Sequence, residues 1–380
     1  TLAKGPKVAA AYKDGAPTKA LEGFARGKGV SVDDVVTAEF DGAQHVAVKQ
    51  TQTGRGVLEV LGEIVADVVS GLRSDKNMKW NDPQLTFSRP IRWVVALWGK
   101  HVVPATVGSL TTGRTTYVAR TAAQPHVDVA AADELVPTLE TAGFVLDPTA
   151  RRRQVVDGAL ALAKSVGGTI DIDGEASLVD EITNLVEEPQ GVLGTFEERY
   201  LELPEQILTT VMRKHQRYLP VRDESGKLMP YFVTMANGAI DDDVVRAGNE
   251  SVLRARYEDA AFFWDADLKV GLDDFRRNID SLTFENRLGS FAQRADRIRD
   301  VAQALAGHVE LSGEDKTTLT RAGELAKFDL STQMVVELSS LAGTMAREYA
   351  LKAGETPAVA EALFEMEKPR SAGDSLPVST

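Results

Sequence analysis

A run of basic residues stands out among the side chains of the sequence that could do chemistry. Arg213, Lys214, His215 and Arg217 fall within five positions, at the end of a helix expected to begin after Pro204. An arginine can bind a phosphate through two N–H groups at once. Positive charge at the carboxyl end of a helix also complements the helix dipole without any ligand. The run therefore has two open interpretations, a phosphate-binding cluster and a helix end stabilised by its own side chains.

Two further arginines, Arg254 and Arg256, belong to a second helix, expected over residues 249–265. The apolar residues of this helix share one face, which we expect to be buried: Leu253, Tyr257, Ala260, Ala261 and Trp264. Arg254 and Glu258 have the i,i+4 spacing of a helix ion pair, so a structural pairing is predicted for them. A phosphate-binding role is left open for Arg256.

The third basic region covers residues 76–120. It holds seven basic residues and one acidic residue, interleaved with three tryptophans and Tyr117. The candidates for contact with a polyanion are Arg89, Arg92, Arg114 and Arg120. A solvated basic face on a half-buried sheet has the same composition, and without other observations it is the favoured interpretation.

The sequence lacks the residues that a metal site, a serine hydrolase site or an acid–base pair would need. The chain has no cysteine, and none of its five histidines has a second histidine at metal-ligand spacing. The sequence contains no Gly-x-Ser-x-Gly motif of the serine hydrolases, and no two carboxylates are spaced in a way that singles them out as an acid–base pair. The residues by themselves predict no catalytic residue and no metal ligand.

The elements that would position these side chains follow from apolar periodicity and turn residues. We expect an α+β chain with an amphipathic helix over 56–72, a strand pair over 91–98 and 101–107, helices at about 131–142, 150–166 and 177–187, and a second strand pair over 218–221 and 228–235. From residue 249 onward nearly all of the sequence predicts helix, with caps at Ser290 and Ser312. Shifts in charge and pattern predict a basic α/β segment (1–120), an α/β continuation (121–275) and a helical part (276–380).

Charge is distributed unevenly along the 380 residues. The net charge is −13, made up of +5 over residues 1–120 and −18 over residues 121–380. A nucleic acid would therefore have to meet discrete basic spots, because phosphates dominate its affinity for proteins. The absence of cysteine fits a reducing compartment, and no apolar run approaches the ~18 residues of a membrane span, so a cytoplasmic protein is expected.

Several of these stretches together resemble one family, the β subunits of the bacterial-type tetrameric glycyl-tRNA synthetases. The stretches that carry the resemblance occur in the family's order and spacing: residues 87–97, 113–116, 188–204, 212–221, 249–264 and 288–289. The resemblance covers essentially the whole chain but only part of such a subunit. We therefore expect a fragment that lacks the subunit's N-terminal start and its C-terminal anticodon-binding region.

The resemblance implies the tRNA-binding subunit of glycine–tRNA ligase. It implies that the glycylation chemistry, with ATP and magnesium, lies on an α subunit, and that this chain holds no cofactor of its own. The implied partners are that α subunit, in an α2β2 assembly, and tRNA(Gly). The residues that we expect to contact tRNA are Arg89, Arg92, Arg114, Arg120, Arg213, Lys214, His215, Arg217, Arg254 and Arg256.

The resemblance also implies a finer description of the fold. The α/β part would be similar to the core domain of the phenylalanyl-tRNA synthetase β subunit, and the helical part to an HD phosphohydrolase domain. Such a domain needs a His-Asp dipeptide to hold its metal, yet the five histidines are followed by Val, Val, Val, Gln and Val. The HD-like domain is therefore expected to be degenerate. An HD-type metal phosphohydrolase and a non-enzymatic interaction scaffold are the alternative interpretations.

Overall fold

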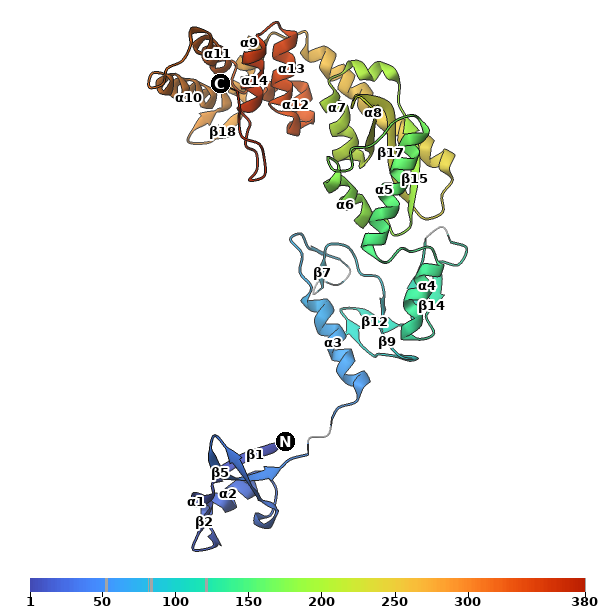
Figure 1. Ribbon diagram of the computed structural model, residues 1–380, viewed down its shortest axis with the longest axis vertical. Coiled ribbons are helices and arrows are strands. Elements are labelled where there is room, and N and C mark those ends of the chain that lie inside the picture. Colours follow the sequence, from blue (N-terminus) through green and yellow to red (C-terminus); the bar gives the residue numbers. More distant parts are fainter. Residues whose placement is uncertain (52–53, 81, 83–84, 120–121, 380) are drawn as a thin grey trace. The chain divides into compact units, whose positions relative to one another are not determined.

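The computed structural model describes residues 1–51, 54–80, 82, 85–119 and 122–379 (Figure 1). It divides into two compact units, one formed by Thr1–Tyr117 with His126–Leu135 and the other by Val118–Pro125 with Val136–Thr380. Helices and strands occur in both units, so the expected α+β class is confirmed. The predicted division into three parts, with boundaries near residues 120 and 275, stays a prediction.

The first unit begins with a small antiparallel sheet that the sequence analysis did not foresee. Its strands are, in spatial order, β1 (Leu2–Lys7), β5 (Ala43–Lys49) and β4 (Val36–Phe40). Helix α2 (Lys19–Gly27) packs beside β1, and Leu21 and Val46 are buried between the elements. A side chain at Gly5 would clash with the ring of Phe24 at 2.7 Å, so glycine lets this helix approach the strand.

The second part of the first unit contains the predicted amphipathic helix, α3 (Val57–Gly71). The predicted strand pair is confirmed only around its turn, where β9 (Leu97–Trp98) pairs with β10 (His101–Val102) across Gly99 at a φ of 56°. The preceding residues form a separate strand, β8 (Val94–Val95), which runs parallel to β12 (Leu110–Gly113). The other strands and the short first helix of this unit are α1 (Val8–Ala11), β2 (Tyr12–Lys13), β3 (Ala16–Pro17), β6 (Met78–Lys79), β7 (Thr86–Phe87), β11 (Thr106–Val107), β13 (Thr115–Tyr117) and β14 (His126–Asp128).

The second unit is built around an antiparallel sheet in which β17 (Leu228–Asn237) lies between β15 (Pro189–Thr195) and β16 (Leu219–Arg222). The hairpin of β16 and β17 is the second predicted strand pair, whereas β15 was not predicted. Side chains alternate along β17, so Phe232 and Val233 enter different cores on opposite faces. Helices α5 (Pro148–Ser165) and α6 (Ala176–Leu185) cover the Val233 face, and α8 (Asp242–Asp267) contributes to the core of the other (Figure 1).

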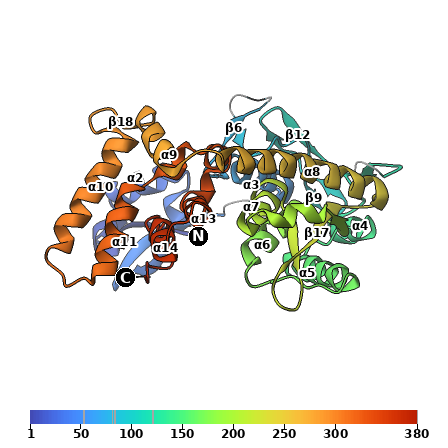
Figure 2. The ribbon, with the colours of Figure 1, turned by 90° about the horizontal axis from the view of Figure 1, so that it is seen from above.

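A helical region follows α8 and packs into the larger of the two cores, to which α8 also contributes. Its helices are α9 (Leu272–Asn278), α10 (Phe291–Ala306), α11 (Gly313–Glu324), α12 (Gln333–Glu337), α13 (Thr344–Lys352) and α14 (Pro357–Glu365). Helices α10 and α11 lie side by side (Figure 2), and both begin with the predicted capping boxes, at Ser290 and Ser312. The part expected to be helical, residues 276–380, also contains a short hairpin that was not predicted, formed by β18 (Thr283–Glu285) and β19 (Gly289–Ser290) before α10.

Helix α8 ties this helical region to the sheet. Its residues Leu253, Tyr257 and Trp264 are buried, as the spacing predicted, and the Trp264 ring stacks on Tyr349 at 5.0 Å between centroids. At its end, the Asp267 carboxylate accepts hydrogen bonds from the backbone N–H groups of Gln333 and Met334 at 2.9 and 3.0 Å. None of the described helices combines the length and the apolar character needed to cross a membrane.

A second buried carboxylate, Asp329, should make the stability of this unit depend on pH. Burial raises the pKa of Asp329 to about 6 from its ordinary value of 3.8, and Asp329 accepts one hydrogen bond from the Gly343 N–H. A carboxyl group whose pKa is higher in the folded state stabilises the fold fully below its unfolded pKa, and this contribution is lost as the pH rises through about 6.

We therefore expect Asp329→Asn, which cannot ionise, to raise the free energy of unfolding at pH 7.5 by about 1–3 kcal/mol. The difference from the unchanged protein should shrink towards zero near pH 4. Urea unfolding at several pH values measures it. A difference that stays constant between pH 4 and 8 would contradict the assignment.

Candidate functional site

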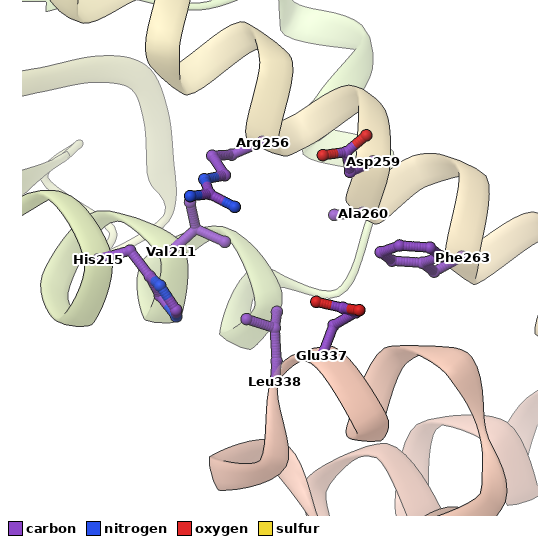
Figure 3. Close-up of a pocket in the computed structure, with 8 residues that line it drawn as sticks. All are labelled: Val211, His215, Arg256, Asp259, Ala260, Phe263, Glu337 and Leu338. Carbon is purple, nitrogen blue, oxygen red and sulfur yellow. The ribbon is translucent and has the colours of Figure 1, made fainter.

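The candidate site is a pocket of about 240 Å³ in the second unit (Figure 3). One wall is the segment after α7 (Glu205–Thr210), where residues Val211–Gln216 continue the helix as a π-helical turn. The other walls are α8 and the end of α12. Ile207, Leu208, Val211 and Met212 are buried, and the helix stops at Arg217 in the left-handed conformation with a φ of 57°. Wide π-helical turns are frequent at functional sites.

Charged groups of both signs line this pocket on an apolar floor. In the view of Figure 3, Arg256 and His215 lie on one side, and Asp259, Phe263 and Glu337 lie on the other. The floor residues are Val211, Ala260 and Leu338. Among the described residues, none forms an ion pair within 4.0 Å with Arg256. The guanidinium is thus near carboxylates without being neutralised by a direct contact.

The predicted cluster at 213–217 is divided by the fold. Arg213 turns towards α6, where its Nε lies 2.8 and 2.9 Å from the two carboxylate oxygens of Glu175, a side chain that is only 5% exposed. Arg217 pairs with Glu181 of the same helix at 2.9 Å. His215 faces the pocket instead, and the exposed Lys214 makes no ion pair in the described part of the chain. The two arginines thus have structural partners, and an RNA contact by either stays a prediction.

The predicted ion pair between Arg254 and Glu258 is wrong. Glu258 pairs with Arg199, which reaches it from a turn in the segment after β15, and Arg254 lies 3.9 Å from Glu197. A hydrogen bond from the Tyr200 hydroxyl, together with the Arg199 guanidinium, lowers the pKa of Glu258. Helical spacing permits the i,i+4 contact, but a partner from another segment occupies this carboxylate.

The described candidates of the basic region 76–120 fall into three different environments. Arg89 is exposed, and Arg92 lies over the rings of Trp93 and Tyr117. Arg114 donates hydrogen bonds to the carbonyl oxygens of Lys100 and Ala130, at 3.0 and 3.1 Å, which is a structural use of its guanidinium. Arg120 lies outside the described residues.

Sequence reasoning missed three residues that give the pocket its character. Asp259 and Phe263 follow Arg256 on α8 at helical spacings of three and seven, which was a local signal that they share a face. Glu337 comes from α12, and no local pattern connects it with Arg256. In the part of the chain that the structure describes, no group of three or more His, Asp or Glu side chains is placed to hold a metal ion.

This arrangement suits binding more directly than bond-making. Arg256 and His215 can hold an anionic group, the two carboxylates can accept hydrogen bonds from hydroxyl or amino groups, and Phe263 offers a ring for a flat apolar group. One nucleotide unit of RNA carries all three kinds of group in its phosphate, its ribose and its base. The pocket is therefore a candidate nucleic-acid contact.

The different surroundings of Arg213 and Arg256 predict different effects on stability. Arg213→Gln should lower the free energy of unfolding by about 1–3 kcal/mol, because it leaves the buried Glu175 carboxylate without its charged partner. Arg256→Gln should change it by less than about 0.5 kcal/mol, since Arg256 is exposed and has no ion pair to lose within the described part of the chain. Urea unfolding of both variants measures the difference, and equal effects would contradict it.

Comparisons with known proteins agree along the whole chain. A family model described as glycyl-tRNA synthetase beta subunit matches residues 1–380. The glycine–tRNA ligase beta subunit of Desulfitobacterium hafniense (strain DSM 10664 / DCB-2) is 41% identical over 380 residues, which are 99% of this chain and 54% of that protein. The glycine–tRNA ligase beta subunit of a Picosynechococcus strain is 40% identical over 381 residues, covering 98% of this chain and 53% of that protein.

A plant protein shows the same similarity. The chloroplastic/mitochondrial glycine–tRNA ligase 2 of Arabidopsis thaliana is 38% identical over 375 residues, which are 98% of this chain and 35% of the plant protein. The chain thus spans about half the length of the bacterial relatives that it matches, and about a third of the plant relative.

Proposed function

The chain belongs to the glycyl-tRNA synthetase β subunit family, and from this premise we propose that it is the tRNA-binding part of a glycine–tRNA ligase. In this proposal an α subunit binds ATP and magnesium and forms glycyl-adenylate. The present chain binds no cofactor and holds tRNA(Gly) so that its acceptor end reaches the adenylate. Its contribution to the rate is positional, because a tRNA fixed in place reacts as though its concentration were very high.

The observation that carries this proposal is that Arg256, which forms no ion pair with any described residue, lines the pocket together with His215. The fold holds Arg213 through the Glu175 carboxylate and Arg114 through backbone carbonyl oxygens. Arg256 has no such partner among the described residues, so its charge is available to a phosphate. Lys214, exposed on the adjoining turn, would add to the local positive charge.

The acidic balance of residues 121–380 limits where RNA can bind. A net charge of −18 repels phosphates overall, so a contact must come from basic groups that are concentrated locally and unpaired. Asp259 and Glu337 lie in the same pocket and would repel a phosphate placed beside them. We therefore assign the phosphate to the Arg256 side and the ribose or base to the carboxylate side.

We also propose the finer fold and assembly that the family resemblance implied. The α/β part would correspond to the core domain of the phenylalanyl-tRNA synthetase β subunit, and α9–α14 to a degenerate HD-like domain in an α2β2 enzyme. The predominance of helices in this region, which the short β18–β19 hairpin interrupts, supports the HD-like interpretation. The sequence has no His-Asp dipeptide to hold a metal, so no observation favours a phosphohydrolase.

The enzyme assembled from α and β subunits provides the test. Arg256→Gln should weaken tRNA(Gly) binding about three- to tenfold and reduce the slope of log affinity against log salt by about 1, as expected for one lost phosphate contact. Glycine-dependent exchange of pyrophosphate with ATP should stay unchanged, because that step needs no tRNA. Filter binding across a salt series and the exchange assay measure the two effects.

A matched control is Arg297→Gln, which removes an exposed arginine of α10 that also has no ion pair among the described residues and does not line the pocket. It should bind tRNA(Gly) as the unchanged enzyme does. If both variants lose affinity equally, the effect is one of net charge and the pocket assignment fails. If the β chain formed glycyl-adenylate without α, the proposed division of work would be wrong.

A further inference from the structure

Four side chains of the first unit form an aromatic and cationic cluster that the pocket does not involve. Tyr117 and His126 are directly opposite each other in the pairing of β13 with β14, and their ring centroids lie 4.1 Å apart. Trp93, just before β8, lies 4.1 Å from Tyr117 with the ring planes inclined at 34°. The guanidinium carbon of Arg92 lies 5.3 Å from the Trp93 centroid and 5.8 Å from the Tyr117 centroid.

The described residues leave the polar atoms of this cluster without a hydrogen-bonding partner. In the described part of the chain, the Arg92 guanidinium, the Trp93 indole N–H, the Tyr117 hydroxyl and the His126 ring make no hydrogen bond or ion pair with the protein. Comparable groups nearby in the sequence behave differently. The Trp80 indole donates to the Phe87 carbonyl oxygen at 2.9 Å, and Arg114 donates to backbone carbonyl oxygens.

The cluster is also accessible. Arg92 and His126 are exposed, and Trp93 and Tyr117 are half-buried. None of the four belongs to a hydrophobic core of the described residues. A large aromatic side chain that is half-buried, with its polar end free, is typical of a contact surface rather than of a core.

The charge of the sequence segment that supplies most of the cluster favours an anionic ligand. The segment 76–120, which supplies three of the four residues, holds seven basic residues and one acidic residue. The carboxylate two positions after His126, Asp128, accepts a hydrogen bond from the Thr115 hydroxyl at 2.6 Å. A ligand that combines a flat π system with a negative charge is therefore the best match to this surface.

We propose that the cluster of Arg92, Trp93, Tyr117 and His126 stacks an unpaired base of bound RNA, and that Arg92 contacts the adjoining phosphate. Aromatic side chains and arginine planes are the usual platforms for splayed-out RNA bases. A base in a duplex cannot reach such a platform, because both of its faces are covered by its neighbours. The inference rests on the proposed function in one respect, that the ligand is RNA.

The test uses the assembled α and β enzyme with a single-stranded RNA oligonucleotide and a duplex RNA of the same length as probes. Tyr117→Leu and Trp93→Leu should each weaken binding of the single strand about tenfold, leaving its salt slope and the binding of the duplex unchanged. Tyr117→Phe keeps the ring and should bind as the unchanged enzyme does. Arg92→Gln should reduce the salt slope by about 1.

A second measurement does not depend on how well the variants fold. A photoreactive single strand that carries 5-iodouridine should crosslink to Trp93 or Tyr117 of the unchanged enzyme, as mapped by mass spectrometry of the peptides. Crosslinks found only at other residues would overturn the inference, and so would leucine variants that fold and bind the single strand with unchanged affinity. If the enzyme still binds tRNA(Gly) in that case, the proposed function stands and only the base-stacking cluster is wrong. An enzyme that binds no tRNA at all would overturn the proposed function as well.

Discussion

The pocket depends on one buried interaction, the contact of the Asp267 carboxylate with the start of α12. Asp267 is 1% exposed, and its two oxygens accept the backbone N–H groups of Gln333 and Met334 and the hydroxyl of Tyr349. A buried carboxylate is costly unless such donors surround it, so the contact holds α12 in one place against the end of α8. Because Glu337 and Leu338 lie at the other end of α12, this contact also sets where they face Arg256.

Helix α8 links the core to the pocket, because one of its faces packs into the core and another lines the pocket. Leu253, Tyr257 and Trp264 repeat at helical spacing and pack into the larger core, which also contains residues of the sheet and of α13 and α14. Arg256, Asp259 and Phe263 repeat at the same period and are displaced around the axis, so they line the pocket. The burial of one face therefore fixes the direction of the other, and the pocket side chains are positioned by a core of which they are not part.

Apolar periodicity and turn residues correctly predicted the helices and strands that are determined by residues close together in the sequence. The helix over 56–72, the strand pair over 218–221 and 228–235 and the two serine caps depend on neighbouring residues, and the structure has all of them. The first sheet and β15 were missed. Their segments contain glycines at positions such as Gly5 and Gly194, where a side chain would clash with Phe24 or Phe232. These glycines weaken the strand pattern in the sequence, and the long-range aromatic contact that requires them cannot be seen from neighbouring residues.

The same limit explains the candidate site, where residue types were predictable and partners were not. The sequence alone gives no reason to treat Arg213 and Arg256 differently. In the structure, Glu175, which lies 38 positions before Arg213, forms an ion pair with Arg213, whereas no carboxylate among the described residues pairs with Arg256. This distinction bears on how a chain with a net charge of −13 can bind a polyanion. Carboxylates that neutralise arginines such as Arg213, Arg217 and Arg199 have less charge left to repel phosphates, because each ion pair is nearly neutral at a distance. Because each such pair already counts as zero in the net charge, the excess of acidic residues still repels a polyanion overall, and the arginines that have no partner among the described residues determine where RNA can be attracted.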